Sequence, residues 1–185
     1  MSNKLLKKIF FGFLFIAMSC SNDLEKIHEI SIQNQATFPV ETIKDFQIIY
    51  SDSSYVRVLI NANLMNRYAD EKKYIEFKDG LKVQFFDFNG KKESELKSRF
   101  AIIDDESDIL SAEQNVVLLN NKGDILETEK LHWNRQTEKI YTDEFIKIIT
   151  ESDTIYGKGL VSDQNFSKYT IKNIKGSMVF DTSYE

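Results

Sequence analysis

The sequence contains few of the residues from which metal sites and nucleophilic active sites are built. Of its 185 residues, one is cysteine and two are histidine, so it cannot form an internal disulfide or the usual set of zinc ligands. No serine lies in a Gly-x-Ser-x-Gly segment, and His28 and His132 are the only neutral-pH bases. The acidic run from Asp104 to Asp108 lacks the glycine and spacing of a calcium-binding loop. These absences leave a serine hydrolase, a zinc site and a calcium loop without support, and we expect no cofactor or metal ion.

The sequence also lacks an apolar run long enough to cross a membrane as a helix. Its most apolar segment, Ile9 to Met18, is shorter than the ~20 residues that a spanning helix needs. It follows a basic start and ends in Ala17-Met18-Ser19 before Cys20, which is the order of a bacterial lipoprotein signal. We therefore expect residues 1–19 to be a signal peptide, or an N-terminal anchor if they are retained, and Cys20 to be acylated. A signal cut nearby, which would leave Cys20 as a free thiol, is the alternative.

The sequence has fewer basic than acidic residues: it contains 24 Lys and Arg and 29 Asp and Glu, which gives a net charge of −5. Loss of the basic leader would make the charge more negative. Such a field repels phosphates, which argues against nucleic acid as a partner. Residues 20–38 are polar and have no sustained period, so they are expected to form a spacer.

Proline occurs once, at Pro39, and beyond it the sequence consists of short runs rich in β-branched and aromatic residues, with turn residues between them. The 14 Phe and 8 Tyr residues supply material for a core. This pattern predicts an all-β fold. The expected strands include Tyr55–Ala62, Tyr74–Phe77, Leu81–Phe88, Ile109–Ala112, Asn115–Asn120, Lys139–Tyr141 and Glu144–Thr150.

Three segments place Asn, Asp or Gly where a hairpin requires φ > 0: Asp79-Gly80, Asn89-Gly90 and Asn121-Lys122-Gly123. Each is predicted to join two neighbouring antiparallel strands. The segment from Leu64 to Lys73 fits a short helix, and a long loop or a bulged strand fits it equally well.

Some runs are apolar at both parities, notably Val116–Leu119 and Phe85-Phe86. Such strands are covered on both faces, or their open face meets an apolar partner; burial on both faces is the simpler interpretation. Short strands with regular turns can form a sandwich, a barrel or a stacked β-roll, and periodicity alone does not choose among them.

Several segments resemble one family in their order and spacing. They are Tyr74–Leu81, Asn115–Val117, Gly123–Asn134, Lys139–Asp143 and Ile155–Leu160. Together they resemble LptC, the periplasm-facing component of the lipopolysaccharide export machine, in its lipoprotein-like Bacteroidetes-type form. The resemblance spans roughly residues 67–180. Well-known members keep an uncleaved membrane helix, whereas this sequence has a lipoprotein-like segment that ends in Cys20.

The resemblance implies an open β-jellyroll of stacked antiparallel strands over residues 39–182, with an apolar interior that shelters the acyl chains of lipopolysaccharide. The protein would be a non-enzymatic relay. It would accept the glycolipid from an inner-membrane ABC transporter and pass it to a periplasmic bridge protein of the same fold through edge-strand pairing. It would stand on the periplasmic side of the envelope, held to the inner membrane through acylated Cys20.

The expected lining of the groove consists of apolar residues chosen from the alternating runs: Val83, Phe85, Val117, Leu119, Leu131, Trp133, Phe145, Ile149 and Ile155. Gly157 and Gly159 match a Gly-x-Gly segment of the family, so we assign them to backbone shape or partner docking. Tyr169 to Phe180 would contain the last strands and the contact with the bridge protein.

Two other classes of function stay open. The same anchor, strands and aromatics suit a β-sandwich surface lipoprotein that binds carbohydrate or protein, which predicts a closed, filled core and exposed aromatic platforms. An anchored hydrolase rests only on the abundance of carboxylates, from which the sequence cannot select a catalytic pair.

Overall fold

The computed structural model describes residues 38–69 and 73–175, and this part of the chain consists of strands and turns without a helix. The strands are β1 (Glu41–Asp52), β2 (Tyr55–Ala69), β3 (Lys73–Phe86), β4 (Lys92–Ser98), β5 (Phe100–Asp104), β6 (Ile109–Asn120), β7 (Ile125–Asn134), β8 (Lys139–Ile149), β9 (Thr154–Asp163) and β10 (Tyr169–Lys175).

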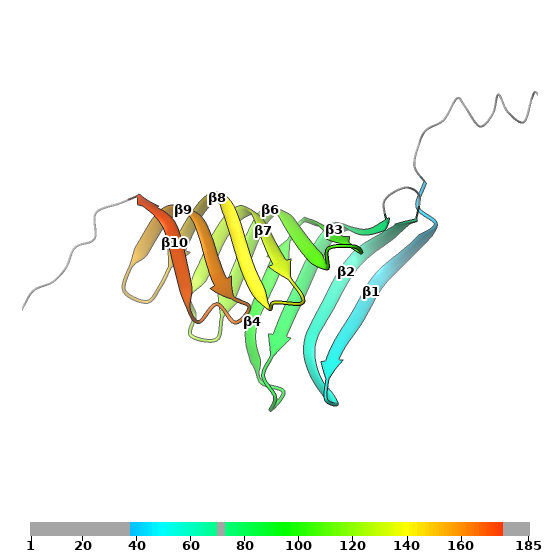
Figure 1. Cartoon of the computed structure of the whole chain (residues 1–185), viewed down its shortest axis with the longest axis horizontal. Coiled ribbons are helices and arrows are strands. Elements are labelled where there is room, and N and C mark those ends of the chain that lie inside the picture. Colours follow the sequence, from blue (N-terminus) through cyan, green and yellow to red (C-terminus); the bar gives the residue numbers. More distant parts are fainter. Residues whose placement is uncertain (1–37, 70–72, 176–185) are drawn as a thin grey trace, which may run out of the picture. The chain divides into compact units, whose positions relative to one another are not determined.

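All ten strands belong to one antiparallel sheet in which most neighbours follow one another along the chain (Figure 1). The exception is at β4 and β5. Both pair with β3 and β6, β4 along one half of those strands and β5 along the other. The two short strands therefore act as one long strand that is interrupted at Arg99.

The long strands bend near their middle. The pairing register shifts at mid-length in β2, β6, β7 and β8. Residues with φ > 0 lie at these corners, among them Asp79 and Gly80 in β3 and Gln114 and Asn115 in β6. Because bulged residues bend and twist a strand, the sheet folds over on itself.

Hydrogen bonds join the corners of neighbouring strands into a continuous line. The side-chain Nδ2 of Asn63 donates to the carbonyl of Asp79 at 2.6 Å. The amide of Gly80 donates to the carbonyl of Arg99, and the amide of Arg99 donates to the carbonyl of Gln114, both at 3.0 Å. These bonds satisfy backbone groups that the bends remove from the regular ladder.

The corner line divides the sheet into two layers. We call layer A the segments 46–62, 81–98, 116–128, 145–157 and 173–175, and layer B the segments 41–44, 64–69, 73–78, 100–113, 131–142 and 160–171, as the register shows. The apolar faces of the two layers enclose one continuous buried cluster. The prediction of an all-β jellyroll is confirmed.

The corners correct several sequence-based expectations. Asp79-Gly80 is a corner inside β3 and not a hairpin, because corners and hairpins both require φ > 0. Of the three alternatives for Leu64 to Lys73, the bulged strand is the correct one: Leu64–Ala69 belongs to β2, directly after the register shift between Ala62 and Leu64. Asn89-Gly90 and Asn121–Gly123 do lie in hairpin turns, as predicted. Pairs of predicted short strands, such as Ile109–Ala112 and Asn115–Asn120, are the two halves of one bent strand.

Strand β4 escaped the sequence analysis because it contains one large apolar side chain, Leu96. Its outer face carries Glu95, whose carboxylate meets Lys97 Nζ at 2.7 Å and Lys92 Nζ at 2.9 Å. Gln84 Nε2 on β3 donates to the same carboxylate at 3.1 Å. The hydrogen bond and charge of Lys97, supported by Lys92 and opposed by burial, lower the pKa of Glu95 to about 2.

The corner residues generate a first prediction. Gln114 has a φ of 66°, and a β-branched side chain in this left-handed region costs more than Gln does. Gln114→Val should lower the free energy of unfolding by about 1–2 kcal/mol in urea titrations. Gln114→Gly should leave it equal to wild type or raise it, because glycine adopts this conformation freely. Equal losses in both variants would contradict the corner geometry.

Glu95 generates a second prediction, on pH. Its pKa is lower in the folded protein than in the unfolded chain, so its stabilising contribution is complete above the ordinary value of 4.5 and is lost as the pH falls toward about 2. Unfolding measured between pH 5 and pH 2 should show a smaller loss of stability for Glu95→Gln than for wild type. Glu151→Gln, in the exposed turn after β8, is the control and should follow the wild-type curve.

Candidate functional site

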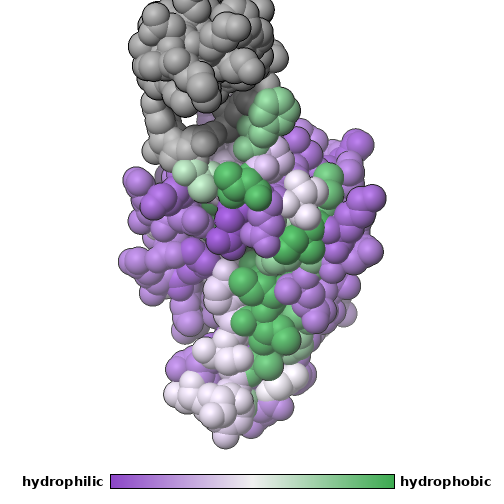
Figure 2. Space-filling model, turned by 90° about the vertical axis from the view of Figure 1, so that its right-hand side faces the viewer, coloured by the Kyte–Doolittle hydropathy of each residue, from purple (hydrophilic) through white to green (hydrophobic). Residues whose placement is uncertain are grey.

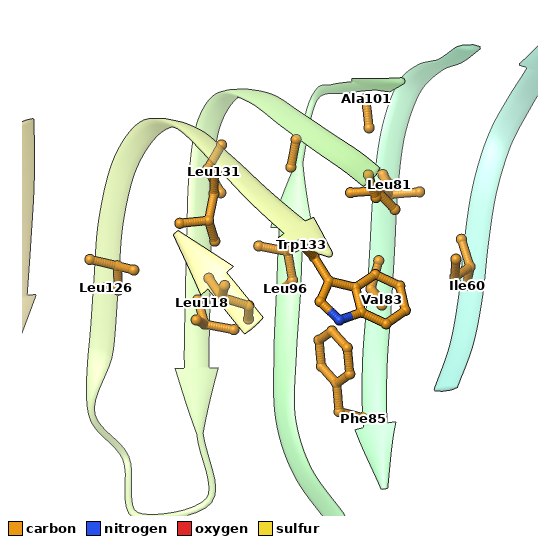
Figure 3. Packing of buried hydrophobic residues seen from close by; sticks show 14 of the residues in the cluster. Ile60, Leu81, Val83, Phe85, Leu96, Ala101, Leu118, Leu126, Leu131 and Trp133 are labelled. Atoms are coloured by element: carbon orange, nitrogen blue, oxygen red, sulfur yellow. The ribbon is translucent and has the colours of Figure 1, made fainter. Parts of the chain in front are cut away.

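The candidate site is the interior between the two layers, which large apolar side chains fill from both sides (Figure 3). Layer A contributes Ile60, Phe85, Leu118 and other side chains that are completely buried, and layer B contributes Leu131 in the same way. Figure 3 shows these side chains directed into one shared space. The interior is therefore a packed apolar layer with no charged residue among its buried members.

An aromatic pair connects the two layers. Phe85 of β3 and Trp133 of β7 meet edge to face, with ring centroids 5.0 Å apart (Figure 3). Trp133 is 3% exposed, and its indole Nε1 has no hydrogen-bond partner. Buried indole groups usually find a partner, so this N–H is a polar donor held inside an apolar wall.

The structure places four of the predicted lining residues, Val83, Phe85, Leu131 and Trp133, inside the buried cluster, and Ile155 packs against it. The remaining four, Val117, Leu119, Phe145 and Ile149, lie on the outer face, which corrects their predicted orientation.

In β6 the run Val116–Leu119 is apolar in both alternating sets of positions, so alternation could not show which set faces inward. Cross-strand register decides it: Leu118 lies opposite Leu96 on one side and Leu126 on the other, and all three are fully buried. In β8 the polar Lys147, between Phe145 and Ile149, was a usable signal that this set faces outward. Phe145 is 58% exposed, with the Nζ atoms of Lys158 and Lys175 at 5.4 and 5.0 Å from its ring centre.

At the β1 end, apolar surface from the interior reaches the outside. Figure 2 shows this end as a stripe of apolar residues between two polar walls. The β1 residues that pack on the buried cluster, Ile43, Phe46, Ile48 and Tyr50, are only partly buried. Phe46 contacts Phe77 of β3, with ring centroids 5.8 Å apart. An apolar chain could therefore enter the interior at this end without crossing a polar layer.

Opposite the corners, the ends of layer A meet the ends of layer B along what we call the seam. Arg135, in the turn before β8, closes one part of it. Its Nη1 donates to the hydroxyl of Tyr50 on β1 at 2.7 Å, and its Nη2 pairs with the carboxylate of Asp108. The loop between β9 and β10 closes another part through hydrogen bonds to Ser94 and Asn120. Sequence reasoning missed both closures, although a single Phe166 in a polar loop was a usable signal.

Gly157 and Gly159 lie in β9, where β10 packs closely against it. A Cβ at Gly157 would stand 2.6 Å from Ile171 Cγ2 and 2.9 Å from the carbonyl oxygen of Asn173. Gly159 has a φ of +80°, and a Cβ there would stand 2.8 Å from Lys172 Cδ. Close approach of two strands is a sufficient reason for both glycines.

The ionisable groups of the described residues form no metal site, because no cluster of three or more His, Cys, Asp or Glu side chains occurs among them. His132 faces outward, with Nδ1 2.8 Å from the hydroxyl of Ser111 and its ring stacked on Tyr141. Burial lowers the pKa of His132. Ser111 and His132 lie directly opposite each other on β6 and β7, so their hydrogen bond is an ordinary cross-strand contact on the outer face of the sheet.

Burial also raises the pKa of Glu93 on β4, assisted by the charge of Asp87 and opposed by Arg57. Arg57 lies over the ring of Phe88 at 4.0 Å.

Within the described ranges no helix is long and apolar enough to cross a membrane. Cys20 and the segment Ser177–Phe180 lie outside the described residues.

Comparison with protein families supplies the deciding observation. The family model for LptC, described as "Lipopolysaccharide-assembly, LptC-related", matches residues 11–178. The chain belongs to the LptC family. A search of curated proteins gives no match.

As an LptC-family member, the chain takes part in lipopolysaccharide export, as a transport component that is not an enzyme. The family role implies binding of lipopolysaccharide and contact with other components of the export complex. It also places the protein on the periplasmic side of the inner membrane. The folded double layer is thus the β-jellyroll that the resemblance implied.

The opposite orientations of Leu118 and Leu119 generate a third prediction. Leu118 is fully buried and Leu119 is 36% exposed. Leu118→Ala should lower the free energy of unfolding by about 2–5 kcal/mol, because it leaves a cavity between the layers. Leu119→Ala should lower it by less than about 1 kcal/mol. Urea titration of these two variants checks the orientation directly. A larger loss of stability for Leu119→Ala than for Leu118→Ala would contradict it.

Proposed function

We propose that this protein is a relay that accepts lipopolysaccharide from an inner-membrane ABC transporter and passes it to a periplasmic bridge protein of the same fold. The observation that carries the proposal is the apolar interior between two antiparallel layers, with apolar surface reaching the outside at the β1 end (Figure 2). The acyl chains occupy that interior, and the polar part of the glycolipid stays outside along the seam.

The energetics favour a carrier of this kind. Exposure of an acyl chain to water costs about 0.8 kcal/mol per CH₂ group. A lining that includes Val83, Phe85, Leu131 and Trp133 offers an apolar environment on both sides of a chain, and the strands' outer faces carry charged residues such as Glu95 and Lys97. The packed interior requires the layers to part when a chain enters, and dispersion contacts with the chain replace those lost between the layers.

The edge strands supply the contacts with the partners. Among the described strands, β1 and β10 each pair on one side only. A free strand edge is a template for pairing with another chain, so strand addition extends the sheet and joins two interiors. We assign the β1 edge to the transporter subunits and the β10 edge to the bridge protein. Acylated Cys20 holds the roll at the inner membrane.

In-cell photocrosslinking tests the relay. A photoreactive phenylalanine analogue at Phe85 should form an adduct with lipopolysaccharide, because Phe85 is fully buried between the layers. The same analogue at Phe145 should form none, since that ring lies on the outer face at 58% exposure. At both positions the analogue replaces a phenylalanine, and the two positions face opposite sides of the sheet. Blots for the protein and for lipopolysaccharide read the result.

One observation favours a second candidate, a lipoprotein that binds carbohydrate or protein on its outer surface. The interior is tightly packed, and Phe145 and Tyr156 line an outer depression of about 520 Å³ together with Val117 and Lys147. Adducts at Phe145 with a glycan or protein, and none with lipopolysaccharide at Phe85, would replace the relay with this function.

A further inference from the structure

The loop between β9 and β10 is built as a strap across the seam. We define the strap as residues 164–168. It begins at the end of layer B, where the amide of Gln164 donates to the carbonyl of Glu138 at 3.1 Å. It then crosses to layer A, where Ser94 Oγ donates to the carbonyl of Gln164 at 2.7 Å and Asn120 Nδ2 donates to the carbonyl of Phe166 at 2.9 Å. Ser94 and Asn120 are directly opposite each other in the β4–β6 register, so both tethers reach one point of layer A.

The strap carries a single large apolar side chain, and it fills the interior. Phe166 is fully buried and belongs to the same cluster as the groove residues. Its ring stacks on Tyr169 of β10, with centroids 5.0 Å apart. Burial raises the pKa of Tyr169, and the charge of Asp124 in the turn before β7 raises it further. The two rings therefore lie at the β10 end of the groove, over the ends of β6 and β7.

The strap is also held together by hydrogen bonds of its own. Asp163 Oδ1 accepts hydrogen bonds from the amides of Ser167 and Lys168, and its Oδ2 accepts one from the Ser167 hydroxyl at 2.6 Å. These bonds lie within the loop and do not depend on layer A. The strap is held to layer A by the tethers from Ser94 and Asn120, by a side-chain hydrogen bond between Asn165 and Glu93, and by the burial of Phe166.

The closed position also carries strain. Phe166 has a φ of 52°, which is costly for a residue with an aromatic side chain. Gln164 Oε1 and Asn165 Oδ1 are buried without a hydrogen-bond partner, and such groups cost free energy that exposure to water would return. Opening of the strap would release these costs, so they lower the free energy needed to displace it.

We propose that the strap is a gate at the exit end of the groove, and that the ring of Phe166 occupies the place of an acyl chain when the groove is empty. An acyl chain of the glycolipid that reaches the β10 end displaces Phe166, and the strap swings away from Ser94 and Asn120. In the empty protein the ring keeps the exit dry. This inference rests on the proposed relay function, and it adds a specific residue that the chain must displace before transfer.

Hydroxyl-radical labelling of the full chain tests the gate without any mutation. Purified lipopolysaccharide is the probe, and the ring of Phe166, which is fully buried in the closed strap, is the reporter. When lipopolysaccharide saturates the protein, labelling of Phe166 should become at least tenfold faster, while labelling of Leu118 in β6 should not become faster. Unchanged or slower labelling of Phe166, in protein that carries bound lipopolysaccharide, would overturn the gate.

A pair of matched serine variants tests the tether. Ser94 and Ser98 are both buried on β4, and each hydroxyl donates to a backbone carbonyl, but Ser98 donates to Phe100 outside the strap. Ser94→Ala should raise the labelling rate of Phe166 severalfold in the absence of lipopolysaccharide, and Ser98→Ala should not. Equal effects of the two variants on the strap would contradict the tether.

Photocrosslinking separates failure of the gate from failure of the relay. A photoreactive phenylalanine analogue at Tyr169 should form an adduct with lipopolysaccharide, because displacement of Phe166 gives a chain access to that ring. An adduct at Phe85 without one at Tyr169 would overturn the gate and leave the relay intact. No adduct at either position would overturn both.

Discussion

The structure depends on the need of a single antiparallel sheet to bury its own apolar face. The described residues 38–69 and 73–175 contain no helix that could cover the sheet, so the long strands bend and bring their second halves over the first halves of other strands. Residues with φ > 0 make the bend, and Asn63, Gly80 and Arg99 join the bends by hydrogen bonds. The apolar interior, the two free edges and the seam all result from this line of corners.

The interior meets two opposing requirements. Stability favours a closely packed core, and carriage of an acyl chain requires that the core can be replaced by a ligand of the same polarity. Layers that are joined at the corners and held at the seam by a few polar contacts satisfy both requirements. Arg135 with Tyr50, and Ser94 with Gln164, are contacts that can break without loss of the sheet. In the proposed relay, these are the contacts that open when a glycolipid crosses the seam.

Much of this protein could be predicted from its sequence because the signals are local. Alternation and turn residues predicted strands, and the spacing of Gly123–Asn134 and Ile155–Leu160 carried the resemblance to LptC, which the family match over residues 11–178 confirmed. The alternation of Leu131, His132 and Trp133 agrees with the structure, in which His132 lies on the outer face between two buried side chains. Strand β4 was missed because Leu96 is its only large apolar side chain, and its pairing with β3 and β6 depends on residues distant in sequence.

The sequence by itself determined the all-β class, the family and an interior rich in apolar side chains, since residue type and order along the chain are sufficient for these. Only the tertiary structure decided which side of β6 faces that interior. Val116 to Leu119 is apolar in both alternating sets of positions, so register across β4, β6 and β7 had to choose Leu118 over Leu119. In the tertiary structure Asp79-Gly80 also forms a corner and Phe166 is buried in the interior. Both outcomes depend on contacts between residues that are distant in sequence.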